Sequence, residues 1–207
     1  MNFFEDSFKS KLYETVEQIE QLSVAEVVVI VRKKSEKYRD ISLIYSICAS
    51  FVVFTILMFI RKEIDAYLIY LITILMFPIV FFTIELIPNL QRFLLSKKRI
   101  NKSVEILGRA LFQKGGVRFT QKRIGILVFV SLLEKKVLLI ADRGVEESVP
   151  NQDIENFETE INKIFNFPQS AEKFLDVLSN LKKILNQYLP PVENDINELP
   201  DNLNIEL

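Results

Sequence analysis

Two long uncharged segments restrict this chain more than any other feature of its sequence. Residues 41–60, ISLIYSICASFVVFTILMFI, and residues 66–84, AYLIYLITILMFPIVFFTI, contain no Asp, Glu, Lys or Arg. Because a helix rises about 1.5 Å per residue, about 20 apolar residues cover the roughly 30 Å hydrocarbon core of a bilayer. The sequence therefore predicts a transmembrane helical hairpin over residues 41–86, with spans at 41–60 and 66–86.

The alternative is that these two segments are buried helices of a soluble domain. Each segment is apolar all round, whereas a helix on a soluble domain carries a polar stripe, and a chain of 207 residues offers little protein to bury both. A cleaved signal peptide is excluded because the first segment begins far from the N-terminus, after a charged amphipathic stretch. Both considerations favour membrane spans.

Basic residues flank the hairpin on its two outer sides. They are Arg32, Lys33, Lys34, Lys37, Arg39, Arg92, Lys97, Lys98, Arg99 and Lys102. The connecting loop offers only Arg61 and Lys62. The positive-inside rule then places both termini in the cytoplasm. We expect a multi-pass protein of the inner (plasma) membrane, with the lipid bilayer as its first partner.

The residue types that are missing exclude several kinds of chemistry. The chain has no His, no Trp and a single cysteine, Cys48. Catalytic triads and Cys–His pairs need an imidazole, and so do most zinc sites. Any metal must be a hard cation such as Ca²⁺ or Mg²⁺ on oxygen ligands. Lys and Arg total 26 against 27 Asp and Glu, so no basic excess indicates nucleic acid as a partner.

The rest of the sequence predicts one domain that the hairpin interrupts. Residues 4–22 have apolar residues at helical spacing, which is typical of an amphipathic helix ending near Ser23. Residues 25–31, AEVVVIV, form a short β-branched run, which favours a central strand buried on both faces. One helix and one strand cannot form a domain alone, so the strand's partners must follow the hairpin.

Those partners are predicted at residues 124–132 and 137–142. The connection between them is short enough for an antiparallel hairpin, although it lacks the usual Asn-Gly turn. Helical patterns follow over residues 103–113, which can continue the second span, after Asn151 as a cap, and from Ser170. The expected fold is α/β, a small mixed sheet with helices on both faces. Its expected parts are residues 1–40 and 87–192, and residues 193–207 form an acidic tail.

Several stretches resemble the TPM domain family, in particular its bacterial membrane-protein branch. They are AEVVVIVRKKSEKYRD followed directly by two spans, GRALF, RIGILVFVSLLEKKVLLIADRGV and PPVENDINELPDNLNIEL, in that order over nearly the whole chain. The sequence departs from the family pattern at Ala25, where members usually have Gly, and at Ile124, where they usually have Thr. The missing threonine hydroxyl weakens any proposal that this corner binds a ligand.

The resemblance implies an α/β/α sandwich interrupted by the hairpin. It also implies a mixed functional record. A phosphatase activity is ascribed to part of the family, and other relatives act in repair of membrane-protein complexes or as auxiliary membrane subunits. The family thus offers both an enzymatic and a non-enzymatic expectation.

The candidate site lies where the last predicted strand ends. Asp142, Arg143 and Gly144 form a candidate ligand or partner site, and Asp142, Glu146 and Glu147 are the candidate metal ligands. Carboxylates can hold Mg²⁺ or Ca²⁺, and Arg143 can pair with a phosphate. The same acidic residues can instead cap a following helix, and Gly144 is expected to take a positive φ in the turn.

These features predict a non-enzymatic interaction or scaffold module at the membrane. No residue is assigned a catalytic role, and the expected partner is another membrane protein or a second copy of the chain. The alternative is a divalent-metal-dependent, phosphatase-like hydrolase that uses the acidic cluster. The acidic tail alternates charged and apolar residues, so it can dock on the chain's own sheet, which we favour, or on a partner.

Overall fold

The computed structural model describes residues 3–60, 64–115, 117, 120, 123–192 and 205–206. The chain divides into two compact units. The α/β unit combines Met1–Ser35 with Asn101–Leu207, and the helical unit is Glu36–Ile100. The helical unit is therefore an insertion between two pieces of chain that fold together.

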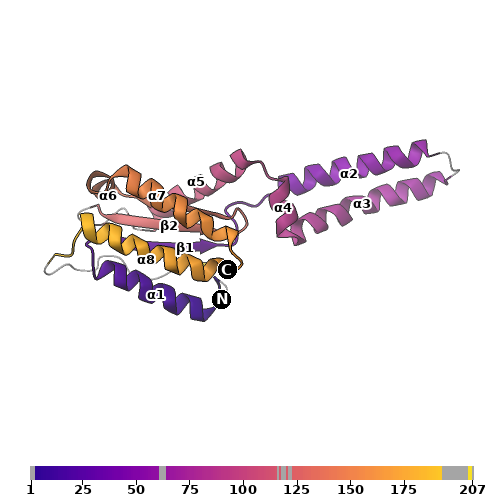
Figure 1. Ribbon diagram of the computed structural model, residues 1–207. Coiled ribbons are helices and arrows are strands. Elements are labelled where there is room, and N and C mark those ends of the chain that lie inside the picture. Colours follow the sequence, from indigo (N-terminus) through magenta and orange to yellow (C-terminus); the bar gives the residue numbers. More distant parts are fainter. Residues whose placement is uncertain are drawn as a thin grey trace. The chain divides into compact units, whose positions relative to one another are not determined.

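The α/β unit is built on a mixed sheet whose strand order is β3-β2-β1-β4 (Figure 1). β1 (Glu26–Arg32) pairs in parallel with β2 (Gly125–Ser131), and β2 pairs antiparallel with β3 (Lys136–Ala141). The predicted antiparallel hairpin is confirmed. In its turn, Lys135 adopts a left-handed φ of 50° in place of an Asn-Gly pair.

The end of the acidic tail lies on the chain's own sheet. β4 (Ile205–Glu206) pairs in parallel with Val31 and Arg32 of β1. Residues 193–204 and 207 of the tail lie outside the described residues.

Helices cover both faces of the sheet, as predicted. Alternate side chains of a strand point to opposite faces. One face packs against α1 (Asp6–Glu20), α7 (Asn151–Asn162) and α8 (Ser170–Tyr188), where Phe8, Phe157 and Phe174 are fully buried. The other face packs against α5 (Lys97–Lys114) through a smaller cluster that includes Phe129 and Val104.

One local prediction is wrong, and two short helices were not predicted. Asn151 is the first residue of α7, and the N-cap position belongs to Pro150. The short helix α6 (Arg143–Ser148) was not expected between β3 and α7. A one-turn 3₁₀ helix, Lys163–Asn166, also joins α7 to α8.

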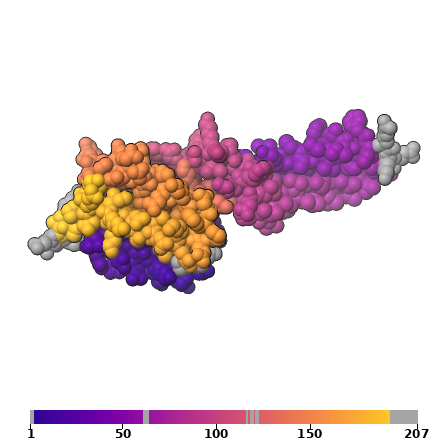
Figure 2. Space-filling model, in the orientation of Figure 1, coloured from indigo at the N-terminus to yellow at the C-terminus, as the bar shows by residue number. Residues whose placement is uncertain are grey.

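The helical unit contains two long helices that pack side by side, and Figure 2 shows their surfaces in contact along their length. They are α2 (Arg39–Phe59) and α3 (Ala66–Leu86), and α3 accommodates Pro78 within its length. α3 does not run on into α5, contrary to one expectation. Proline restricts the residue before it to extended backbone, so Pro88 ends α3 and begins α4 (Pro88–Leu94).

Candidate functional site

Asp142 caps the short helix that follows β3. Its Oδ1 accepts a hydrogen bond from the Arg143 N–H at 2.8 Å, which is the arrangement of an N-cap. The side chain is only 8% exposed, and its Oδ2 has no hydrogen-bond partner among the described residues. The capping alternative considered for the acidic residues therefore accounts for one of the two carboxylate oxygens.

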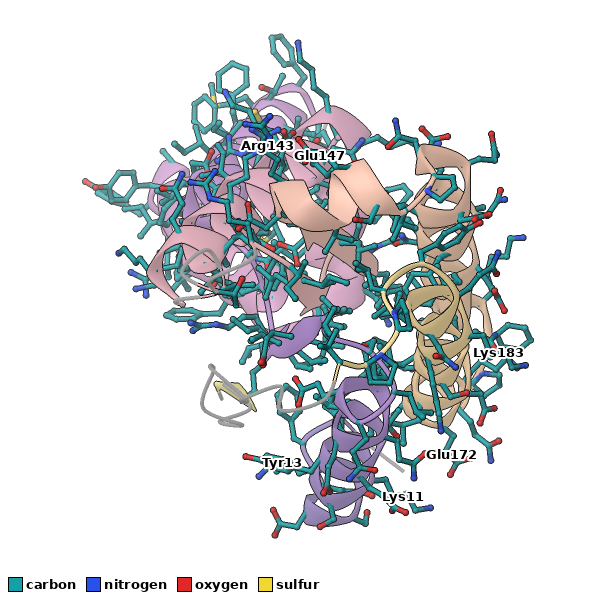
Figure 3. The ribbon with its side chains drawn as sticks, turned by 90° about the vertical axis from the view of Figure 1, so that its left-hand side faces the viewer. Lys11, Tyr13, Arg143, Glu147, Glu172 and Lys183 are labelled. Carbon is teal, nitrogen blue, oxygen red and sulfur yellow. The ribbon has the colours of Figure 1, made fainter. Side chains whose placement is uncertain are left out.

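Arg143 and Glu147 form an ion pair on the outer surface of α6. The Arg143 Nε donates to the Glu147 Oε1 at 2.6 Å, and both side chains are mostly exposed (Figure 3). This hydrogen bond raises the pKa of Arg143. Gly144 is the second residue of the helix, so the predicted positive φ is wrong. Helical residues have negative φ, and α6 already includes Gly144 because it begins at Arg143.

The three candidate metal ligands do not gather around one point. Within the described residues, no group of three or more Asp, Glu or Cys side chains is placed to hold a metal ion. Glu147 pairs with Arg143, Asp142 is buried under the helix start, and Glu146 faces a groove. Of the predicted site residues, only Glu146 lines that groove.

The groove follows β3, the edge strand of the sheet, and has a volume of about 680 Å³. α5 and α7 form its walls. Its apolar lining comes from Phe112, Ile154 and the strand residues 138–141, and its polar lining includes Asn101, Glu105, Arg109, Gln113, Lys136, Glu146 and Asn151. A concave apolar surface with a polar rim is typical of a binding site.

α7 blocks one half of the free edge of β3. The Asn162 side chain accepts from the Val137 N–H at 2.8 Å and donates to the Val137 C=O at 2.9 Å. The Glu158 carboxylate lies beside the Leu139 N–H, whose hydrogen bonding acts to lower the Glu158 pKa. Along an edge strand, the main-chain N–H and C=O groups of every second residue point to the free edge. Val137 and Leu139 are two such residues, so Ala141 is the next and presents its N–H and C=O there. Within the described chain no hydrogen-bond partner is recorded for those two groups or for the Leu139 C=O.

Sequence reasoning missed both blocking residues. Asn162 and Glu158 are one helical turn apart on α7, and each looks like an ordinary solvated helix residue in the sequence. The sequence carries no signal for them, because it does not show that α7 faces the free edge of β3. Edge strands commonly carry such protection against pairing with another chain.

Burial raises the pKa of Glu158, and the neighbouring Glu155 raises it further. Lys136 and the hydrogen bond from the Leu139 N–H act in the opposite direction. The folded protein therefore holds the Glu158 proton more tightly than the unfolded chain does.

We expect Glu158→Gln to remove one pH-dependent part of the stability. A carboxyl whose pKa is raised on folding stabilises the folded state most below its unfolded pKa of about 4.3, and this contribution is lost as pH rises through the folded pKa. The free energy of unfolding of the Gln variant, relative to the unaltered chain, should therefore rise between about pH 4 and pH 7. Urea unfolding across that range measures this, and parallel pH profiles would contradict it.

A second buried carboxylate joins the ends of the two parallel strands. Glu134 is only 1% exposed and accepts hydrogen bonds from the Ser35 N–H at 2.9 Å and from the Ser131 hydroxyl. The Ser35 and Ser131 hydroxyl oxygens also lie 2.7 Å apart. Sequence reasoning placed Glu134 in the short connection between the two predicted strands. Nothing in the local pattern shows that the chain after β1 covers this residue.

The helical pair is apolar and largely exposed. α2 and α3 have mean hydropathies of 2.3 and 2.4, and only 17% and 11% of their most apolar segments are buried. Both helices are long and apolar enough to cross a membrane, and within the described chain they are not the core of a soluble fold. Tyr67 and Tyr70 are exposed near the start of α3, and tyrosines are enriched at membrane interfaces.

Small polar side chains line the contact between the two helices. The buried residues of α2 are Ser42, Ser46 and Ser50, which recur every fourth residue. The expectation that α2 is apolar all round is therefore wrong. Small residues allow close approach of membrane helices. At one end of this contact, the Glu85 carboxylate accepts from the Ser42 hydroxyl at 2.6 Å and from the Gln91 amide at 3.1 Å.

The basic residues predicted to flank the hairpin differ in their environments. Lys34, Lys37, Arg39, Lys97, Lys98 and Lys102 are exposed. Arg99 instead donates to Glu36 at 2.6 Å and lies 3.2 Å from an Asp40 oxygen, and the hydrogen bond to Glu36 raises the pKa of Arg99. Arg32 is half-buried in β1, where burial lowers its pKa, and Lys33 lies over the Phe4 ring. Arg92 is half-buried in α4.

These features define a mixed α/β protein that carries two candidate membrane helices. The chain resembles the BA42 protein of the psychrophilic bacterium Bizionia argentinensis, solved by NMR, with a TM-score of 0.60 and 14% sequence identity. The similarity covers 99% of this chain and 97% of that one, and at this identity it establishes the fold alone. No protein-family model matches the sequence, and no curated protein matches it significantly.

Proposed function

We propose that this protein is a membrane-anchored interaction module without enzymatic activity. α2 and α3 cross the inner membrane, and both termini lie in the cytoplasm with the α/β unit. The exposed apolar surface of the two helices supports the anchoring, since such a surface is unfavourable in water. The basic residues on both outer flanks support the orientation.

The observation that carries the interaction role is the open half of the β3 edge inside the groove. An extended segment can add to an exposed sheet edge, with main-chain hydrogen bonds for affinity and side-chain pockets for specificity. The Leu139 C=O and both main-chain groups of Ala141 offer those bonds, and Phe112 and Ile154 line the groove beside them. The expected occupant is an extended segment of another membrane protein or of a second copy.

The substitution Ala141→Pro tests this role. Proline lacks an N–H, and the Ala141 N–H points away from β2, so the sheet keeps its own hydrogen bonds. Ala141→Val is the matched control, because it changes the side chain and keeps the N–H. Each variant is purified from detergent-solubilised membranes, and the co-purifying proteins are identified by mass spectrometry.

We expect the Val variant to retain the partner and the Pro variant to lose it, with similar melting temperatures for both. A partner that the Pro variant retains at full yield would show that binding does not use this edge. The anchoring is tested separately by alkaline extraction of membranes, which releases peripheral proteins. Release of the full chain would contradict it.

The hydrolase alternative has no observation of its own in support. Its three carboxylates lie in different environments, and the described residues contain no cluster that could hold a metal ion. Divalent-dependent phosphatase turnover by the pure protein, abolished by Asp142→Ala, would favour that alternative over the interaction role.

A further inference from the structure

The short helix α4 leaves an aromatic side chain exposed at the base of the helical pair. Phe93 is 83% exposed, and Leu86, at the end of α3, is 77% exposed. Ile87, between the two helices, is also exposed. Exposed apolar side chains are therefore present at the end of α3, in the connection and on α4.

α4 is fixed to the base of the pair by its opposite side. Gln91 is almost fully buried, and its amide donates to the Glu85 carboxylate that also receives the Ser42 hydroxyl. Pro88 forces the chain to leave the axis of α3 at this point. Figure 1 shows α4 lying across the base of α2 and α3. If the pair crosses a bilayer along its length, α4 lies parallel to the membrane surface.

Positive charge gathers at the same base. Lys37 precedes α2, Arg39 is its first residue, and Lys97 and Lys98 follow α4. All four side chains are exposed. The acidic residues beside them, Glu36 and Asp40, are both paired with Arg99. Arg99 compensates one of these two negative charges, so the four exposed cations still outnumber the one carboxylate charge that remains.

We propose that α4 is an interfacial helix that binds the headgroup region of an anionic phospholipid bilayer. Phe93 inserts at the boundary between headgroups and acyl chains, as aromatic residues of interfacial helices do, and Lys97 and Lys98 contact the lipid phosphates. This inference rests on the proposed membrane anchoring. It adds a lipid-binding surface that the two spans alone do not require.

The absence of tryptophan from the chain makes a direct test possible. Three single-tryptophan variants of the full chain are reconstituted in vesicles: Phe93→Trp in α4, Phe51→Trp near the middle of α2, and Phe167→Trp on the surface of the α/β unit. Phospholipids brominated at shallow or deep positions of the acyl chain quench tryptophan according to its depth.

We expect shallow bromines to quench Phe93→Trp most strongly, deep bromines to quench Phe51→Trp most strongly, and neither to quench Phe167→Trp. If Phe93→Trp resembles Phe167→Trp while Phe51→Trp is quenched, the interfacial role of α4 is wrong and the anchoring stands. If Phe51→Trp also escapes quenching, the anchoring itself fails.

A second measurement tests the charged part of the proposal. The emission of Phe93→Trp is compared in vesicles of phosphatidylcholine and in vesicles that also contain phosphatidylglycerol. We expect a larger blue shift with the anionic lipid, and we expect Lys97→Gln combined with Lys98→Gln to remove that difference. Equal emission in both vesicle types would overturn the preference for anionic lipid.

Discussion

Replacement of Gly125 by alanine is expected to lower the free energy of unfolding by about 3 kcal/mol or more, because it overpacks a rigid contact. A Cβ at this position would lie 2.1 Å from the Val117 carbonyl oxygen and 2.7 Å from its Cγ1. The obstructing oxygen belongs to the main chain of a fully buried residue, and Gly125 itself begins the central strand β2. Gly125 cannot move away without disturbing its pairing with Glu26 of β1.

Urea unfolding of the full chain in detergent micelles, followed by circular dichroism, measures this effect. Gly144→Ala is the matched control. Gly144 is the second residue of α6 and has helical backbone, so the same substitution should be neutral or stabilising there. Equal losses in both variants would show that the close approach of Val117 does not determine the result.

The second large effect is expected at Glu134. Removing this carboxylate by Glu134→Ala leaves the Ser35 N–H without its buried acceptor, and leaves the Ser131 hydroxyl with only the Ser35 hydroxyl beside it. Hydrogen bonds to charged groups contribute about 1.5–3 kcal/mol each, and an unsatisfied buried donor costs about 1–3 kcal/mol. We expect a loss of about 3 kcal/mol in the free energy of unfolding.

Glu134→Gln separates the hydrogen bonds from the charge. Glutamine keeps one acceptor oxygen at nearly the same volume, so its loss should be about half that of alanine. The double variant with Ser131→Ala should lose less than the sum of the two single variants, since the residues interact directly. Additive losses would mean that Glu134 acts through other contacts.

The strands of the α/β unit could be predicted because their physical cause is local. The apolar runs of β1, β2 and β3 are visible in the sequence, and the short connection between β2 and β3 favours a hairpin. The predicted ends differ from the observed ones by one residue or so. The parallel pairing of β1 with β2 could not be predicted, because it depends on where the inserted helices return the chain.

The site residues were harder to predict because their environment comes from distant segments. Asp142 is acidic and follows a strand, a pattern that fits a metal ligand and an N-cap equally well. Glu134 is buried only because the chain around Ser35 covers it, and the local sequence does not show that contact. Asn162 has no signal of its own, since its role exists only opposite the free edge of β3.

The parallel pairing of β1 with β2 also sets a waiting time during synthesis. Each residue of β1 pairs with one that lies 99 positions later in the chain. At about 5–20 residues per second, β1 waits roughly 5–20 s for its partner while the ribosome produces both long helices. In that interval α1 is its main available cover. Under the proposed membrane anchoring, a hairpin that failed to return the chain to its starting side would leave β1 without β2, so completion of the sheet would depend on correct insertion of both helices.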